Sequence, residues 1–274
     1  SFTAFERIAN RNKPGKSLQF ERDRKIIFDA DILLPVSVRP GGHMEKLIGE
    51  RKNDGNCRII DRFRIEHDNR PNPISYSMEK VKPSPRLLEA GNKYLIHWTR
   101  ATNGPWPGEK KREYFFDLLK SKSYPRDGFH TLQNILKACR IAASSLHMPK
   151  GVSTVSFSGL SPEKAARLMK WRSRYRIMSF EPYGVGVERK IAEKLGILPV
   201  RYHPPGAIPS DAPSWLLQSE GLKTDWKREE EYRYPADFDL SLLDRGAIVC
   251  FCRRRAEAEQ IRERFGNASF HFEE

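Results

Sequence analysis

The chain has few cysteines, and their spacing matches no disulfide framework or metal-binding motif. Only four occur among 274 residues, and none belongs to a C-x-x-C pair. Cys250 and Cys252 lie two positions apart in an apolar run, with no His-x-x-His partner nearby, and the other two are Cys57 and Cys139. Such sparse thiols indicate a reduced, cytoplasmic protein in which the cysteines are mostly buried. No bound metal is expected.

Several other signatures are missing as well. No apolar run approaches the roughly 20 residues of a membrane span, so no membrane partner is expected. The chain has no phosphate-binding glycine loop and no hydrolase triad. The segment Tyr183-Gly184-Val185-Gly186 lacks the third glycine of a dinucleotide fingerprint, and its glycines are expected to turn the chain instead.

The chain has fewer acidic residues than basic ones. The chain carries 49 Lys and Arg against 35 Asp and Glu, which gives a formal net charge of +14. The excess extends along the whole chain and is not confined to a tail. A field of this kind favours a polyanionic partner, with nucleic acid the first candidate and an anionic membrane surface a distant second. The alternative is a charge-rich protein surface without such a partner.

The sequence contains many short apolar segments that read as strands and a few that read as helices. Strands are expected at residues 25–28, 32–36, 94–98, 151–158, 175–180, 198–202, 226–234 and 247–252. Helices are expected at residues 129–139, 188–195 and 257–265, and after Ser161, which is followed by proline as at a capped helix start. Strands and helices without regular alternation predict an α+β fold.

Two short segments carry chemically useful groups at or within predicted strands. The first is His97-Trp98-Thr99, and the second is Trp226-x-x-Glu229-x-Glu231-Tyr232-Arg233. A histidine on one strand and a glutamate on another are what a protein needs to hold NAD and cleave its nicotinamide bond. The carboxylate stabilises the oxocarbenium-like state, and arginines grip the diphosphate in a fork.

These segments resemble parts of the ADP-ribosyltransferase superfamily. His97-Trp98-Thr99 is similar to the first-strand motif of the DarT-type toxins, which ADP-ribosylate DNA. Ile135-Leu136-Lys137, Ala142-Ala143-Ser144 and Val155-Ser156-Phe157-Ser158 resemble the helix and strand that follow it in those toxins. The segment from Trp226 to Arg233 is similar to the W-x-x-E-x-E-[WY]-R signature of related bacterial proteins, many of them linked to phage defence.

The resemblance covers roughly residues 91–255 and implies both a fold and a site. The fold would be a split mixed or antiparallel sheet with flanking helices in a domain of residues 91–274. Residues 1–90 would form an N-terminal extension or small domain of unknown role. The implied NAD contacts are His97, Trp98, Thr99, Phe157, Ser158 and Arg174.

The implied catalytic residues are Glu231 and Arg176, and Glu229 remains an alternative to Glu231. In one continuous strand over residues 226–234, alternation would put Glu229 and Glu231 on the same face and Glu230 on the other. The arginine at 176 follows the strand of Phe157, where the family carries its catalytic arginine.

A basic run extends from Lys164 to Arg176 and contains no acidic residue. It is either one face of a solvated helix or a surface that follows a phosphate backbone. We expect nucleic-acid contacts from Lys170, Arg172 and Arg174. Trp106 joins them because it lies in a loop with two prolines, where a large ring is hard to bury.

The resemblance therefore implies an NAD-dependent ADP-ribosyltransferase that modifies nucleic acid, with DNA favoured over RNA. Such an activity is toxic to its own cell, so a toxin or antiphage effector with a neutralising antitoxin is the natural context. Two alternatives remain open. One is a non-catalytic nucleic-acid-binding module on the same fold, and the other is a transferase that modifies a protein.

Overall fold

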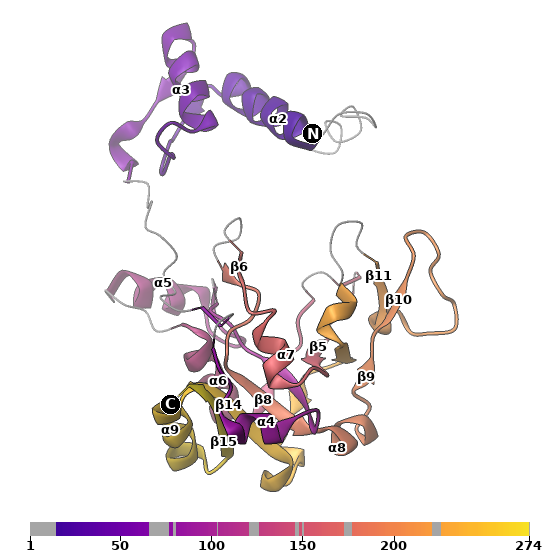
Figure 1. Cartoon of the computed structure of the whole chain (residues 1–274). Coiled ribbons are helices and arrows are strands. Elements are labelled where there is room, and N and C mark those ends of the chain that lie inside the picture. The colour runs from indigo at the N-terminus through magenta and orange to yellow at the C-terminus, as the bar shows by residue number, and fades with distance from the viewer. Residues whose placement is uncertain are drawn as a thin grey trace. The chain divides into compact units, whose positions relative to one another are not determined.

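The computed structural model divides the chain into two compact units, Ser1–Pro73 and Ile74–Glu274 (Figure 1). The structure describes residues 15–65, 77–78, 81–102, 104–120, 126–145, 148–149, 151–172, 177–220 and 226–273. The division falls earlier than the expected boundary at residue 90. The reason is helix α4 (Pro85–Ala90), which packs on elements of the second unit, and the hydroxyl of its N-cap Ser84 donates to the carbonyl of His271 at 2.9 Å.

The described part of the first unit, residues 15–65, contains two helices and a two-stranded parallel sheet. These are α2 (Gly15–Asp29), α3 (His43–Asp54), β1 (Ile32–Leu33) and β2 (Arg58–Ile59), followed by the 3-10 helix η1 (Asp61–Phe63). The expected strand at residues 25–28 is wrong, because this segment lies within α2. Its apolar residues continue a helix-forming, charged stretch in which Lys25 and Asp29 form an i, i+4 ion pair, and the surrounding helix overrides the local strand preference.

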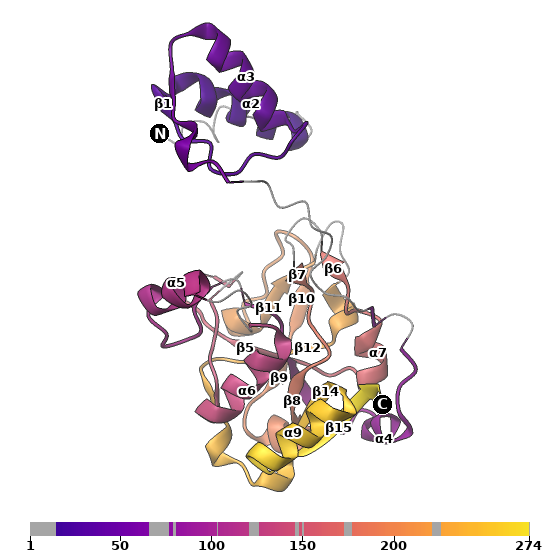
Figure 2. The same ribbon diagram turned by 90° about the vertical axis from the view of Figure 1, so that its left-hand side faces the viewer.

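The second unit is built around a seven-stranded sheet, seen from two sides in Figures 1 and 2. Its strand order is β15-β14-β8-β3-β5-β12-β9. In chain order these strands are β3 (Tyr94–Trp98), β5 (Val155–Ser158), β8 (Gly184–Glu188), β9 (Leu198–Pro199), β12 (Glu231–Tyr234), β14 (Ile248–Arg254) and β15 (Ala268–Glu273). Only β14 and β15 pair in parallel. The α+β class and the mainly antiparallel sheet are thus confirmed.

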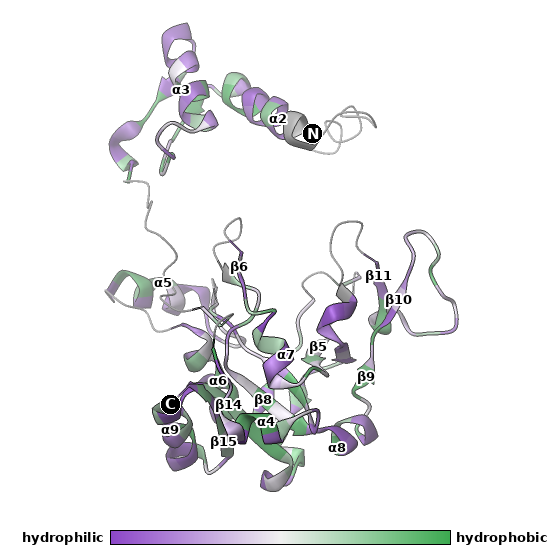
Figure 3. Cartoon of the chain, viewed as in Figure 1, coloured by the Kyte–Doolittle hydropathy of each residue, from purple (hydrophilic) through white to green (hydrophobic). Residues whose placement is uncertain are grey.

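Hydrophobic layers cover both faces of this sheet. One layer joins Leu95 and Val185 to helices α6 (Gly128–Ala138), α8 (Arg189–Lys194) and α9 (Arg255–Phe265). The other layer joins Ile96 and Phe251 to α4 and to α7 (Pro162–Ala166). Successive strand residues point to opposite faces, so neighbours such as Leu95 and Ile96 enter different layers. Figure 3 shows apolar residues along the strands of this sheet and mainly hydrophilic residues in α9.

Several predicted boundaries are confirmed by the capping contacts. Ser161 caps α7 by accepting a hydrogen bond from the backbone N–H of Lys164, with Pro162 as the first helical residue. Asp127 caps α6 by accepting from the N–H of His130 at 2.9 Å. Helix α9 ends at Gly266, whose φ of 73° lies in the left-handed region that glycine tolerates best.

The remaining elements are short. They are α5 (Lys111–Lys120), the pairs β4 (Arg140–Ile141) with β13 (Phe238–Asp239), β6 (Trp171–Arg172) with β7 (Ile177–Met178) and β10 (Arg201–His203) with β11 (Leu217–Ser219), and the 3-10 helices η2 (Ser214–Leu216), η3 (Trp226–Glu229), η4 (Leu240–Leu242) and η5 (Arg245–Ala247). None of the helices in the described ranges is long and apolar enough to cross a membrane.

The four cysteines are free thiols with different surroundings. Cys250 and Cys252 are buried in β14, as expected for an apolar run, and burial raises the pKa of Cys250 to about 12. Cys57 is half-buried, and Cys139 is exposed at the left-handed C-cap of α6, so the expectation that most cysteines are buried fails there.

Candidate active site

Strand β5 lies between the strand of His97 and the strand of Glu231. It pairs with β12 through Glu231 opposite Ser158 and Arg233 opposite Ser156. It pairs with β3 at one position, Ile96 opposite Ser158. Because neighbouring strands lie about 4.8 Å apart, the two sequence segments are brought within roughly 10 Å of each other across β5.

The side chain of His97 fills the place where β3 and β5 separate. Continuing the register from Ile96 and Ser158 would put Trp98 opposite Ser156, but the carbonyl of Ser156 instead accepts a hydrogen bond from Nδ1 of His97 at 2.9 Å. The ladder therefore opens after a single pair, and the imidazole bridges the gap. Nδ1 carries the proton in this contact, so Nε2 of the neutral ring is left as an acceptor.

The surroundings of His97 favour the neutral form of its ring. Desolvation lowers its pKa below the ordinary value, and the hydrogen bond to the Ser156 carbonyl offsets part of that effect. A neutral histidine at this position presents a hydrogen-bond acceptor without a competing positive charge, which suits contact with a ribose hydroxyl.

Three donors hold the carboxylate of Glu231 in one orientation. The hydroxyl of Ser156 donates to Oε1 at 2.7 Å, Nε of Arg233 donates to Oε1 at 2.9 Å, and Nη2 of Arg233 donates to Oε2 at 3.0 Å. Arg233 is only 4% exposed and also donates to Oε1 of Gln218 at 2.8 Å. A two-pronged arginine contact of this kind fixes a carboxylate more firmly than a single bond does.

The acidic triplet does not lie on one strand, so the expected strand over residues 226–234 is partly wrong. Residues 226–229 form the 3-10 helix η3, Glu230 has a φ of 43°, and β12 begins only at Glu231. The carbonyl of Glu230 accepts from the N–H of Gly159 at 2.8 Å, which holds the turn. Strand alternation therefore cannot place Glu229 beside Glu231.

Glu229 is placed near Glu231 by a contact of the 3-10 helix η3, not by strand alternation. Its carbonyl accepts from the hydroxyl of Ser158 at 2.8 Å, which brings η3 against the end of β5. Burial and the charge of Glu231 raise the pKa of Glu229, and the positive charge of Arg172 partly offsets this. Both Glu229 and Glu231 thus remain candidates for the catalytic acid, whereas Glu230 is exposed.

The raised pKa of Glu229 gives a testable effect on stability. A carboxyl whose pKa is higher in the folded state than in the unfolded state destabilises the fold when it is ionised. Replacing Glu229 by glutamine is therefore expected to leave the melting temperature unchanged or higher at pH 8. This advantage over the wild type should shrink as the pH falls toward 4. The difference in melting temperature between the variant and the wild type is measured from pH 4 to pH 8. A difference that is smaller at pH 8 than at pH 4 contradicts the prediction.

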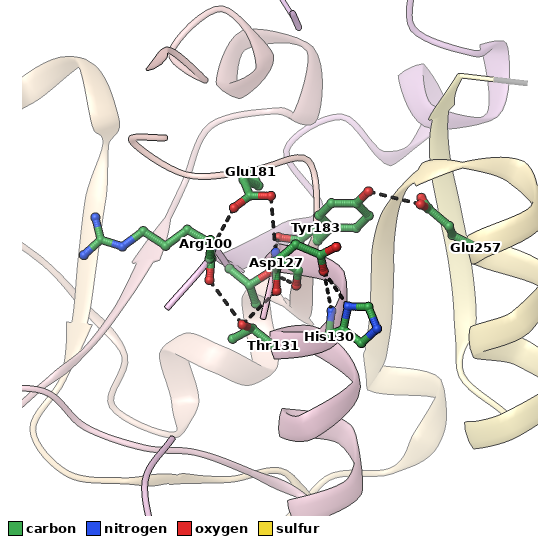
Figure 4. Close-up of polar contacts among 10 residues, drawn as sticks. Arg100, Asp127, His130, Thr131, Glu181, Tyr183 and Glu257 are labelled. Atoms are coloured by element: carbon green, nitrogen blue, oxygen red, sulfur yellow. Dashed lines mark hydrogen bonds and ion pairs between the residues drawn. The ribbon is translucent and has the colours of Figure 1, made fainter. Parts of the chain in front are cut away.

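A buried network holds the end of β3 against α6 (Figure 4). The hydroxyl of Thr99, which is 2% exposed, lies 2.7 Å from the carbonyl of Gly128 and 3.2 Å from that of Tyr183. The carboxylate of Glu181, 1% exposed, accepts from the N–H of Ala101 at 2.5 Å and of Gly128 at 3.2 Å. A Cβ at Gly128 would lie 2.9 Å from atoms of Glu181 and Tyr183, so the network requires glycine there.

The other residues expected to contact NAD support the site from inside the protein. Trp98 packs against the rings of Phe180, Phe251 and Phe272, with centroids 5.5–6.2 Å apart. Phe157 is 2% exposed in the first hydrophobic layer. The contacts that Trp98, Thr99, Phe157 and Ser158 make with neighbouring side chains and backbone position His97 and the glutamates.

The basic run is not one helical face. Helix α7 ends at Ala166, Lys170 is exposed beyond it, and Arg172 lies in β6. Arg174 and Arg176 lie outside the described residues. The predicted catalytic arginine and one predicted phosphate contact therefore have no described position.

Trp106 is engaged within the protein. The guanidinium of Arg126, a residue that is 5% exposed, lies 4.1 Å from the centroid of the Trp106 ring and 4.6 Å from that of Tyr114. Arg126 also forms an ion pair with Glu109. One face of the Trp106 ring is thus covered by a cation. Less of the ring is therefore free to stack on a base than the sequence indicated.

Sequence reasoning missed Arg100, although it directly follows the His97-Trp98-Thr99 segment. The residue is exposed, and Figure 4 shows its side chain extending away from the network that holds its backbone. Desolvation lowers the pKa of its guanidinium, and the charge of Arg172 lowers it further. Its position directly after the His97-Trp98-Thr99 segment was the available signal.

Two further observations concern metal-binding groups and surface recesses. Within the described ranges, no three His, Cys, Asp or Glu side chains form a group that could hold a metal ion. An open recess on α5 is lined by Glu109, Phe116 and Lys120 among others, and it contains none of the predicted site residues.

In comparisons with protein-family models, with curated proteins and with solved structures, nothing matches this chain. The likeness to ADP-ribosyltransferases therefore remains a resemblance of sequence motifs.

Proposed function

We propose that this chain is a cytoplasmic, NAD-dependent ADP-ribosyltransferase that modifies nucleic acid, with DNA favoured as the acceptor. One observation carries the proposal. Ser156 contacts both predicted partners, because its carbonyl accepts from His97 and its hydroxyl donates to Glu231. A histidine acceptor and an oriented carboxylate thus flank one residue at the point where β3 and β5 separate.

In the proposed reaction, the bond between the ribose carbon and nicotinamide breaks, and nicotinamide leaves as a neutral molecule with the bonding electrons. The carboxylate of Glu231 stabilises the positive charge that develops on the ribose. A lone pair of the acceptor then forms the new bond to that carbon, and the acceptor's proton passes to a carboxylate, for which Glu229 is the nearby candidate. His97 orients the substrate through its neutral ring. NAD is consumed as a substrate, and the scheme uses no metal.

The charge distribution supports a nucleic-acid acceptor. The chain carries a net charge of +14, and both Lys170 and Arg100 are exposed. A polyanionic acceptor is attracted by such a field, and its binding should weaken as salt increases. Modification of nucleic acid would be toxic to the cell that makes the enzyme. The proposal therefore includes a toxin or antiphage role with an antitoxin that neutralises the activity.

A second candidate is a nucleic-acid-binding module without catalysis. It is favoured by the state of Glu231, whose two carboxylate oxygens are both engaged by Arg233 and Ser156. In that case the ion pair between Glu231 and Arg233 serves only to stabilise the fold. The module would bind DNA or RNA in a salt-dependent manner, and NAD would not change its melting temperature.

Transfer of label from radiolabelled NAD decides between these functions. The wild-type chain is incubated with single-stranded DNA, duplex DNA, RNA and lysate protein in parallel, and NAD-induced changes in melting temperature are recorded. We expect label on a nucleic acid, most strongly on DNA. Label on protein alone would replace the proposal with a protein-modifying transferase. No label and no thermal shift, together with salt-sensitive nucleic-acid binding, would establish the non-catalytic module.

A further inference from the structure

One guanidinium group connects three strands of the sheet beside the acidic residues. Arg189, the first residue of α8, donates from Nε to the carbonyl of Asn92 at 3.0 Å, shortly before β3. Its Nη2 donates to the carbonyl of Gly159 at 2.7 Å, directly after β5. Its Nη1 donates to the hydroxyl of Tyr232 in β12 at 2.9 Å. All three acceptors are uncharged, so the planar fork of the guanidinium, and not its charge alone, matches this arrangement.

Gly159 connects this contact to the acidic triplet. While its carbonyl accepts from the guanidinium, its N–H donates to the carbonyl of Glu230 at 2.8 Å. Glu230 has a φ of 43°, a conformation that costs free energy for a residue with a side chain and persists only where its surroundings hold it. The neighbouring hydroxyl of Ser158 donates to the carbonyl of Glu229 at 2.8 Å. The end of β5 thus holds both carbonyls that precede β12.

The three groups that meet here pack closely around Gly159. A Cβ at this position would lie 2.8 Å from Cε2 of Tyr232, 3.2 Å from Nη2 of Arg189 and 3.4 Å from the carbonyl oxygen of Glu230. The guanidinium carbon of Arg189 lies 5.4 Å from the centroid of the Tyr232 ring. Glycine is therefore required for this close approach of the side chains to the backbone.

Arg189 reaches the acidic residues from the face of the sheet opposite to Glu231. Strand alternation puts the side chain of Tyr232 on one face of β12 and those of Glu231 and Arg233 on the other. Tyr232 packs against the hydrophobic layer that contains Phe157. The guanidinium thus acts on the candidate site through the backbone at the end of β5.

We infer that Arg189 is a positioning residue for the candidate active site. Its contacts with Gly159 and Tyr232 fix the turn at Glu230, and this turn sets where Glu229 lies and where β12 begins. A displacement of about 1 Å can reduce catalysis about 10²-fold. The effect on transfer rests on the proposed function, whereas the effect on the turn does not.

Hydrogen exchange in Arg189→Lys tests the turn without reference to activity. Lysine keeps the charge but has no planar fork, so it cannot serve the three acceptors in the same way. Exchange of the Gly159 amide, measured by NMR on the full chain, reports on its bond to Glu230. We expect this exchange to be about tenfold faster in the variant than in the wild type. The amide of Thr99, which donates to the carbonyl of Tyr183 at 2.8 Å, is the internal reference and should stay within about twofold.

Label transfer gives the second measurement. Arg189→Lys should lower kcat about tenfold or more and change the KM for NAD by less than about threefold, because it moves the carboxylates without removing a substrate contact. Tyr232→Phe removes one of the three acceptors, so it should fall between the wild type and Arg189→Lys in both measurements. It replaces Arg189→Lys if that variant does not fold. Arg262→Lys, the same exchange at an exposed residue of α9, is the matched control and should leave both measurements unchanged.

The outcomes separate the positioning role from the proposed function. Unchanged exchange at Gly159 would overturn the inference, because the contact would then not hold the turn. Equal acceleration at Gly159 and Thr99 would also overturn it, because the variant would then have lost stability in general. Faster exchange at Gly159 alone, without any transfer of label by the wild type, keeps the contact that holds the turn and removes the enzyme. Faster exchange with an unchanged kcat keeps the enzyme and removes the positioning role.

Discussion

Replacing Glu231 by glutamine is expected to reduce ADP-ribose transfer by roughly 10²- to 10⁴-fold, the range by which catalytic carboxylates and electrostatic stabilisers act. Glutamine keeps an oxygen that accepts from Ser156 and Arg233 but loses the negative charge. Arg233 retains Gln218 and the carbonyls of Trp215 and Leu217 as acceptors, so the fold should survive. Initial rates of label transfer, measured beside melting curves, give both quantities.

Matched changes within the acidic triplet sharpen this experiment. Glu230→Gln removes the same charge one position away on an exposed residue, and it should alter the rate by less than about threefold, as expected of an exposed charge. Glu229→Gln should reduce transfer if Glu229 receives the acceptor's proton. Full activity in both Glu229→Gln and Glu231→Gln would remove the carboxylate pair from the mechanism.

The largest loss of stability is expected from Glu181→Ala. The substitution leaves the backbone N–H groups of Ala101 and Gly128 without their buried acceptor. Each unsatisfied buried donor costs about 1–3 kcal/mol, so the free energy of unfolding should fall by about 4 kcal/mol. The end of β3, the start of α6 and the segment before β8 would loosen together, because the Glu181 carboxylate connects all three.

Tryptophan fluorescence is the appropriate readout for this loss. All five tryptophans, Trp98, Trp106, Trp171, Trp215 and Trp226, belong to the second unit, so urea titrations report on that unit alone. Glu181→Gln should lie between wild type and Glu181→Ala, because its amide oxygen satisfies one of the two donors. Glu263→Ala, on the exposed side of α9, is the control and should change stability by at most about 0.5 kcal/mol. Equal stability of Glu181→Ala and Glu263→Ala would show that the carboxylate does not hold these segments.

Local patterns were sufficient to locate several elements that carry the site. The apolar segment at residues 94–98 and the alternation at residues 151–158 predicted strands, and β3 and β5 lie there. Ser161 followed by proline predicted the start of α7, since a hydroxyl cap and a fixed φ act within one turn. These interactions involve residues close together in the chain, so the sequence alone contains them.

Long-range contacts decided the rest of the site. Glu230 adopts a left-handed conformation because its carbonyl is held by Gly159 at the end of β5, and no local feature of three successive glutamates marks that break. The same contact moved Glu229 off the strand that alternation had assigned to it.

The sequence by itself determined the α+β class, several strands and helices of the second unit, and the strongly basic charge, because periodicity and capping act locally and charge is additive. It did not reveal β8, since the glycines expected to turn the chain at Gly184 and Gly186 lie within that central strand. Only the tertiary structure decided that His97 and Glu231 meet at Ser156, that Glu229 approaches from a 3-10 turn, and that the helix after residue 84 packs on the second unit. Strand pairing and register join residues far apart in the chain, and their energies depend on partners that no single segment specifies.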